Sequence, residues 1–159
     1  MDKRTSDYQA VLVTPFGKLG VVVSEGYLLR IDLLAVSHPK LSPTTAGAAQ
    51  VVVELQNYLQ NPTAPLDVRL KIDGSDFQQK VWRLLQQIPV GKTQTYGELA
   101  AVLNSSARAV GNACRSNPCP LVIPCHRVVG KTGLGGFSGK TSGPMLELKR
   151  WLLKHEGVL

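Results

Sequence analysis

The residues with the clearest chemical potential are Cys125 and His126, which are adjacent in the run Ile-Pro-Cys-His-Arg-Val-Val at residues 123–129. A cysteine becomes a strong nucleophile when its thiol loses a proton, and a nearby imidazole can take that proton or stabilise the anion. Arg127 adds positive charge, and Pro124 fixes the backbone before the thiol. The run predicts a reactive thiolate. On the Cys-His pair alone, a buried cysteine that only fills space is the alternative.

The first half of the chain is predicted to form a small antiparallel sheet with one helix. Three apolar segments separated by short turns favour strands. They cover residues 8–14, 19–24 and 27–34. Apolar residues at helical spacing predict a helix over residues 45–60. The alternation of apolar and charged residues over 66–72 predicts a further strand that is half-buried.

The second half is predicted to be mostly helical. Residues 75–78 and 95–98 each fit a capping box, in which Ser or Thr accepts from the third helical amide and Gln or Glu reaches back. The second box opens a short helix that ends at Leu103. A turn over residues 104–106 then leads into a helix over residues 107–115. Two short helices joined by a three-residue turn are typical of a helix-turn-helix.

Asp73-Gly74 marks the predicted boundary between the halves, so we expect an N-terminal domain over residues 1–73 and a C-terminal domain over residues 74–159. A last helix is expected from near Pro144 to Gly157. The fold class is α+β, with a small N-terminal α/β domain containing an antiparallel sheet, followed by a mostly helical domain that contains the helix-turn-helix.

The charge is concentrated in the second half. Residues 1–76 hold seven Lys or Arg and eight Asp or Glu, a net charge of −1, whereas residues 77–159 hold eleven and three, a net charge of +8. A basic half favours a polyanionic partner, and a basic surface kept for solubility is the alternative. Three cysteines cannot all pair within one chain, which fits a reducing compartment. With neither a membrane-spanning run nor a signal peptide, we expect a cytoplasmic protein.

Longer stretches around Cys125 resemble a known family. Residues 117–129 read Asn-Pro-Cys-Pro-Leu-Val-Ile-Pro-Cys-His-Arg-Val-Val, residues 107–111 read Ala-Arg-Ala-Val-Gly, and residues 151–157 read Trp-Leu-Leu-Lys-His-Glu-Gly. Together they closely resemble the O6-alkylguanine-DNA alkyltransferases, which repair DNA by transferring an alkyl group onto their own cysteine. The resemblance is strong over about residues 77–157 and looser over the N-terminal half.

The resemblance implies a fold, a reaction and a partner. The N-terminal domain would be ribonuclease H-like and the C-terminal domain winged-helix-like. The protein would bind double-stranded DNA, flip out O6-alkylguanine and also O4-alkylthymine, and transfer the alkyl group to Cys125 irreversibly. Flipping is required because the alkylated oxygen lies inside the duplex. The product thioether is not regenerated, so each molecule would act once. We expect no cofactor, no metal and no membrane partner, and a monomer in the absence of DNA.

The same resemblance assigns roles around the thiol. Cys125 would be the nucleophile and alkyl acceptor, and His126 the base that takes its proton. Glu156 would orient His126, and Asn117 would brace the active-site turn. Tyr96 would help to rotate the nucleotide and donate a proton to the departing guanine. From the residues alone, Glu156 could be an exposed glutamate at a helix end, and Tyr96 could be a core aromatic.

The second helix of the helix-turn-helix would lie in the minor groove of the DNA. Arg108 matches a residue that acts as a finger and fills the gap left by the flipped nucleotide. Ala107, Ala109 and Gly111 are small enough to let the helix backbone approach DNA closely, and Arg115 adds a charge at the helix end. The alternative is that Arg108 pairs with a surface carboxylate and that the small residues pack on a neighbouring helix.

The resemblance places the guanine pocket at Val128 and in the glycine-rich loop that contains Gly136, Phe137 and Ser138. Ser138 would hydrogen-bond near the guanine oxygen, and the carbonyl of Val128 would read the exocyclic amine. Phe137 stands where some family members carry Tyr, so a hydroxyl contact is absent there. Residues 140–145 make a longer link to the last helix than is usual in the family, which changes the expected pocket wall.

Three other functions fit parts of the pattern. Cys114, Cys119, Cys125 and His126 could bind zinc, but they lack a close Cys-x-x-Cys pair, and adjacent Cys-His ligands strain tetrahedral geometry. A Cys-His-Glu hydrolase or amidotransferase could use the same three catalytic residues, although it would not need a basic helix-turn-helix. A DNA-binding module without catalysis would not need to keep Cys125.

Overall fold

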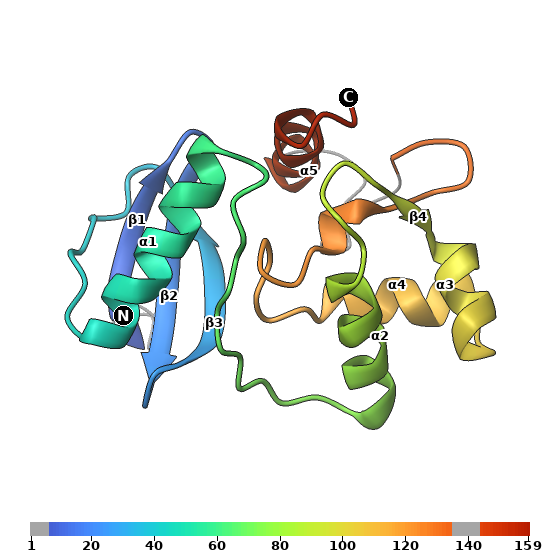
Figure 1. Ribbon diagram of the computed structural model, residues 1–159, viewed down its shortest axis with the longest axis horizontal. Helices are drawn as coiled ribbons and strands as arrows, with labels where there is room; N and C mark the ends of the chain where they lie inside the picture. Colours follow the sequence, from blue (N-terminus) through green and yellow to red (C-terminus); the bar gives the residue numbers. More distant parts are fainter. Residues whose placement is uncertain (1–6, 135–143) are drawn as a thin grey trace. The chain divides into compact units, whose positions relative to one another are not determined.

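The computed structural model describes residues 7–134 and 144–159 and divides into two compact units, Met1–Ile72 and Asp73–Leu159 (Figure 1). Gly136, Phe137 and Ser138 therefore lie outside the described residues. Within the described part of the chain, no helix is long and apolar enough to cross a membrane.

The first unit contains a three-stranded antiparallel sheet in the order β1-β2-β3. The strands are β1 (Ala10–Thr14), β2 (Gly17–Ser24) and β3 (Tyr27–Leu34), so the three strands predicted from the sequence are confirmed with small shifts at their ends. Glu25 and Gly26 connect β2 to β3 with φ angles of 53° and 80°. Positive φ at both central residues gives the turn a twist that matches the two strands.

The helix α1 (Ala46–Gln60) packs on this sheet (Figure 1). Its first turn is capped by Thr45, whose hydroxyl oxygen accepts from the amide of Ala48 at 3.1 Å. The sequence prediction began one residue earlier, at this cap. The buried face of α1 includes Val51, Leu55 and Tyr58. This burial forms the core of the first unit together with the odd-numbered residues of β2.

The strand predicted over residues 66–72 is wrong. The apolar side chains of this segment are half-buried and the charged ones exposed, as the alternation indicated. The backbone, however, meets β3 through one isolated parallel bridge between Leu28 and Leu70. Leu28 donates to the carbonyl of Arg69 and accepts from the amide of Lys71. Alternation reports which side chains face the core, but a strand also needs a continuous partner.

The described residues of the second unit form helices and one very short parallel ladder. Its elements are α2 (Asp76–Gln86), β4 (Gln94–Thr95), α3 (Tyr96–Leu103), α4 (Ala107–Arg115), the 3-10 helix η2 (Cys125–Arg127), β5 (Val128–Val129) and α5 (Pro144–His155). β4 and β5 pair in parallel and were not predicted. Both capping boxes are confirmed, with Ser75 and Thr95 as the capping residues.

The turn between α3 and α4 depends on Asn104, which takes a left-handed conformation with φ of 52° and ends α3. Asn tolerates this conformation better than most residues because its short polar side chain can bond locally. Ser106 then caps α4 by accepting from the amide of Ala109 at 3.1 Å. The two predicted helices and their three-residue turn are therefore present.

Apolar residues at helical spacing predict that α2 buries Phe77, Val81, Leu84 and Leu85, and the observed burial differs. Val81 and Leu85 are buried as expected, but Phe77 and Leu84 are only half-buried. Trp82, which the apolar pattern did not select, is buried instead. An indole can be buried without cost when its N–H finds a partner, and Trp82 donates to the carbonyl of Ala113 on α4 at 2.9 Å.

We expect Gly20→Ala to destabilise the first unit. A Cβ at this position would lie 2.6–2.8 Å from three ring carbons of Tyr8, whose hydroxyl donates to Asp32 at 2.6 Å. Overpacking of this kind costs about 1–3 kcal/mol, which chemical denaturation would measure. Gly111→Ala is the control, because nothing lies within 4 Å of its added Cβ. Equal stability of the two variants would contradict a steric clash between the added Cβ and Tyr8.

Candidate active site

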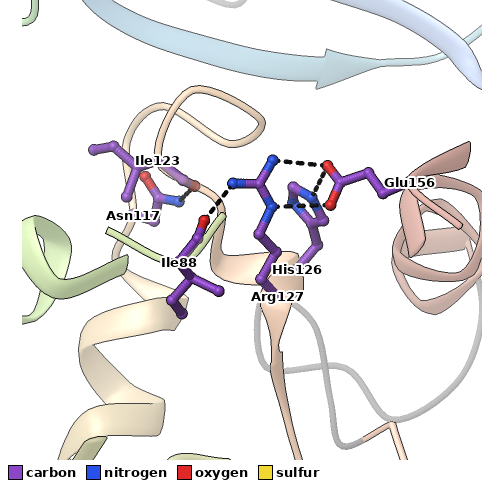
Figure 2. Close-up of polar contacts among 6 residues, drawn as sticks. All are labelled: Ile88, Asn117, Ile123, His126, Arg127 and Glu156. Atoms are coloured by element: carbon purple, nitrogen blue, oxygen red, sulfur yellow. Dashed lines mark hydrogen bonds and ion pairs between the residues drawn. The ribbon is translucent and has the colours of Figure 1, made fainter. Parts of the chain in front are cut away.

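Cys125 is the first residue of η2, and its side chain is almost completely enclosed, with 4 % of the residue exposed. Its thiol is held by Asn117, whose Nδ2 donates to Sγ at 3.2 Å and to the carbonyl of Ile123 at 2.8 Å. The Oδ1 of Asn117 accepts from the amide of Cys119 at 2.9 Å. Asn117 therefore uses both ends of its amide to hold the turn that leads to the thiol, and Figure 2 shows its bond to the carbonyl of Ile123.

The same turn contains Leu121 with φ of 74°, and the residue is 1 % exposed. A branched residue in the left-handed region is strained, and such strain persists where the surroundings over-determine the conformation. The bonds of Asn117 and the burial of Leu121 supply that constraint. The hydrogen bonds of Asn117 and the burial of Leu121 thus hold the backbone before Cys125 in one conformation.

Glu156 lies just after α5 and binds two side chains of η2 (Figure 2). Its Oε1 accepts from Nε of Arg127 at 2.9 Å, and its Oε2 accepts from Nη2 of Arg127 at 2.9 Å and from Nε2 of His126 at 2.8 Å. The guanidinium also donates through Nη1 to the carbonyl of Ile88 at 2.7 Å. All three charged or polar side chains are buried.

This arrangement changes the part expected of Arg127. The sequence placed its charge beside the thiol, but the contacts of its guanidinium are with Glu156 and the carbonyl of Ile88. A planar guanidinium matches a carboxylate with two parallel bonds. Arg127 therefore fixes the carboxylate that in turn fixes His126.

The contact with Glu156 selects the tautomer of His126. A carboxylate accepts hydrogen bonds, so Nε2 of His126 carries the proton and donates it to Oε2. Nδ1 is then the basic nitrogen, and it is buried without a partner among the described residues. The imidazole therefore has one nitrogen locked and the other available as a proton acceptor.

Burial is the main cause of the pKa shifts at the site. It raises the pKa of the Cys125 thiol to about 11, while the bond from Asn117 and the charge of Lys149 act in the opposite direction. Burial also lowers the pKa of His126 from its ordinary value, against the opposing effect of Glu156. At neutral pH the resting pair is a thiol and a neutral imidazole.

Lys149 is a functional candidate that the sequence interpretation missed. It is fully buried, and its Nζ donates to the carbonyls of Val128 at 2.6 Å and Leu134 at 2.5 Å. Burial lowers its pKa to about 8, and interactions with Cys125 and Cys114 oppose that shift. The available signal was its spacing: Lys149 precedes Leu152, Leu153 and Glu156 by three, four and seven residues, on the buried face of α5.

Tyr96 and Cys114 complete the surroundings of the thiol. The Nζ of Lys149 lies 5.9 Å from the ring centroid of Tyr96. Burial raises the pKa of Tyr96 above its ordinary value, with smaller contributions from Cys114 and Cys125. Burial raises the pKa of Cys114 to about 12, and Cys125 adds to that shift. Tyr96 is therefore within electrostatic reach of Cys125 and Cys114.

The predicted DNA-contacting residues lie along α4. Ala107, Arg108 and Arg115 are exposed, and Ala109 and Gly111 are half-buried. No described atom lies within 4 Å of a Cβ added at Gly111, so that point of the helix faces open space. The structure thus leaves the small residues and Arg108 accessible for a partner.

Two other sequence interpretations meet new contacts. The carbonyl of Val128, expected to read a guanine amine, already accepts a hydrogen bond from Nζ of Lys149. The zinc alternative used Cys114, Cys119, Cys125 and His126. Among the described residues, no group of three or more His, Cys, Asp or Glu side chains is arranged to hold a metal ion.

Glu156→Gln should strongly destabilise the protein, because it leaves the buried Arg127 without a carboxylate. Removing one partner of a buried ion pair costs about 3–5 kcal/mol. Urea denaturation would measure the loss. Glu147→Gln on the exposed face of α5 is the matched control and should change stability little. Similar stabilities for the two variants would show that Glu156 does not carry the network.

The sequence of the chain is similar to those of known proteins. Residues 76–158 match the family model described as "6-O-methylguanine DNA methyltransferase, DNA binding domain". A methylated-DNA–protein-cysteine methyltransferase of Salmonella typhimurium is 36% identical over 168 residues, covering 93% of this chain and 94% of its own. The constitutive enzyme of that name from Bacillus subtilis is 32% identical over 166 residues, with 96% of each chain covered.

Solved structures give the same result. The O6-methylguanine methyltransferase of Mycobacterium tuberculosis superposes with a TM-score of 0.78 at 32% identity, covering 92% of this chain and 90% of its own. A structure of the M. tuberculosis protein in complex with DNA gives a TM-score of 0.77 at 33% identity with the same coverage. With relatives above 30% identity along almost its whole length, this chain belongs to the family of O6-methylguanine-DNA methyltransferases, the methylated-DNA–protein-cysteine methyltransferases.

Proposed function

We propose that this protein repairs DNA by transferring the alkyl group of O6-alkylguanine to Sγ of Cys125, once per molecule. The observation that carries the proposal is the coordinated setting of one thiol. Asn117 binds Sγ, and the adjacent His126 keeps Nδ1 free while its Nε2 is locked by Glu156. The names of the relatives describe transfer to a protein cysteine, and Cys125 is the cysteine of this chain with that setting.

His126 supplies the base. Because burial raises the pKa of the thiol and lowers that of the imidazole, the resting proton stays on sulfur. Nδ1 takes this proton directly or through one water molecule when the electrophile is in place. The imidazolium that forms is stabilised by Glu156. Lys149 and the amide of Asn117 stabilise the thiolate, since both lower the pKa of Cys125.

The transfer is an in-line displacement at the alkyl carbon. The sulfur lone pair forms the S–C bond while the C–O6 bond breaks, and its electrons go to the guanine. Protonation or hydrogen bonding of the purine ring disperses the charge that develops there. Tyr96 is the proposed donor, because its raised pKa keeps the phenol protonated. The thioether has no easy hydrolytic route, so the protein is consumed.

Access to the base requires that the nucleotide leave the stack. We assign this step to α4, which would enter the minor groove with its small residues Ala107, Ala109 and Gly111 against the backbone. Arg108, exposed in the first turn of α4, would fill the gap in the stack, and Arg115 would bind phosphate. The structure of the M. tuberculosis relative in complex with DNA supports DNA as the partner, and we propose that this DNA is double-stranded.

Finer features follow from the family resemblance. We assign DNA binding and alkyl transfer to the C-terminal domain, residues 74–159, with a winged-helix-like arrangement, and a ribonuclease H-like fold to the N-terminal domain, residues 1–73. O4-alkylthymine is a second substrate, Ser138, Gly136 and Phe137 form the guanine pocket with Val128, and the DNA-free protein is a cytoplasmic monomer that needs no cofactor. These features rest on the resemblance.

The function is tested by incubating the protein with a duplex that contains one O6-methylguanine and mapping its peptides by mass spectrometry. One methyl group should appear on Cys125 and nowhere else, with one guanine repaired per protein molecule. Cys125→Ser should remove the transfer. A methyl group on Cys114 or Cys119, or repair beyond one equivalent, would contradict the proposal. Multiple turnover would instead favour a hydrolase.

The pH dependence tests His126 as the base. Because burial lowers its pKa, the neutral imidazole persists below pH 6.5, and the single-turnover rate should be flat between pH 6.5 and 7.5 with an acid midpoint below 6.5. Direct ionisation of a thiol with a pKa of about 11 would instead raise the rate about tenfold per pH unit. Circular dichroism at each pH confirms that the protein remains folded. A rate that rises through this range contradicts the assignment.

A further inference from the structure

The C-terminal end of α4 is held by residues outside the DNA-contacting surface. The last carbonyls of a helix have no partner within the helix and must find one elsewhere. The carbonyl of Asn112 accepts from the backbone amide and the hydroxyl of Ser116, and the carbonyl of Cys114 accepts from the backbone amide of Asn117. The carbonyl of Ala113 accepts from the indole N–H of Trp82 on α2 at 2.9 Å.

The hydrogen bond between Trp82 and Ala113 joins two buried residues. Each of the two residues is 2 % exposed, so water cannot replace the indole as the donor. An unsatisfied buried carbonyl is costly, and this makes the bond sensitive to the position of the helix. A shift of α4 along or around its axis would break it. Trp82 therefore fixes the register of α4 against α2.

The position of the indole is itself fixed by Gly74, which lies just before α2. A Cβ at Gly74 would lie 2.6 Å from both Cη2 and Cζ3 of the Trp82 ring, so the chain can pass there only without a side chain. The φ of Gly74 is not in the left-handed region, so this glycine is explained by close approach. The ring is thus confined at its far edge and bonded at its N–H.

The end of α4 that Trp82 holds leads directly to the thiol. Asn117, whose amide bonds to the carbonyl of Cys114, donates through its side chain to Sγ of Cys125. The opposite end of α4 carries Arg108, five residues before Ala113, or about 7.5 Å along the axis. The register of α4 therefore sets the position of Arg108 relative to the sulfur.

We propose that Trp82 is a positioning residue that fixes the register of α4 through its hydrogen bond to Ala113. This position of α4 matters for repair within duplex DNA, because the flipped base must reach Cys125 while Arg108 fills the gap that the base leaves in the stack. A free base needs neither nucleotide flipping nor Arg108, so its reaction with Cys125 depends less on the register of α4. The inference rests on the proposed function of Cys125 and Arg108.

The test compares two single-turnover rates: repair of O6-methylguanine in a duplex and reaction with free O6-benzylguanine. Trp82→Phe retains an aromatic ring but removes the N–H. It should slow duplex repair about tenfold and change the free-base reaction less than about twofold. Arg108→Ala is the positive control and should shift the ratio of the two rates in the same direction. The wild-type protein must first methylate Cys125; if it does not, the proposed function fails, whatever Trp82 does.

A second variant distinguishes a loss of helix position from a general loss of stability. Val81→Ala removes buried apolar contact from the same helix without touching the hydrogen bond, so it should lower stability and leave the ratio unchanged. A Trp82→Phe ratio within about twofold of wild type, or the same ratio change in Val81→Ala, would overturn the inference. If Trp82→Phe does not fold, Gly74→Ala decides, since it displaces the ring while keeping the N–H. The same ratio change is then expected, and an unchanged ratio overturns the proposal.

Discussion

The buried carboxylate of Glu156 is the interaction on which the active site depends. A carboxylate removed from water needs charged or hydrogen-bonding partners, and Glu156 accepts hydrogen bonds from Nε and Nη2 of Arg127 and from Nε2 of His126. Because these partners belong to η2, the end of α5 is fixed against the residues that directly follow the thiol. Arg127 extends the constraint to the carbonyl of Ile88, just after α2. The pair of Glu156 and Arg127 thereby joins three segments that are far apart in sequence.

The charges of this network explain how the site can keep a thiol at rest and still use a thiolate. Glu156 and Arg127 neutralise one another, so His126 receives no net charge that would force it to be protonated, and burial keeps it neutral. Lys149 is also a buried cation; it bonds to the backbone carbonyls of Val128 and Leu134 and stabilises negative charge on Cys125. Its positive charge is in place before the sulfur ionises, so little reorganisation accompanies the proton transfer.

Local signals in the sequence predicted the elements that depend on local physics. Both capping boxes are present because a Ser or Thr and a residue three positions later satisfy each other without help from the rest of the chain. The hairpin at Glu25-Gly26 is likewise local. The strand expected over residues 66–72 failed because alternation reports burial, whereas a strand needs a neighbour, and only Leu70 has one. The ladder of β4 and β5 was invisible, since two residues carry no period.

The sequence by itself determined the family, through the run around Cys125, and it named His126, Asn117 and Glu156 by resemblance. It could not determine which donors meet Glu156, because a linear pattern does not say which charges share a buried volume. That buried volume forms only when α5 packs against η2. In it, Lys149 bonds to the carbonyl of Val128, directly after η2, and Arg127 bonds to the carboxylate of Glu156. The sequence shows which residues can do chemistry. Which of them pair, and so which of them carry a proton, depends on the tertiary structure, because desolvation makes every unpaired buried charge costly.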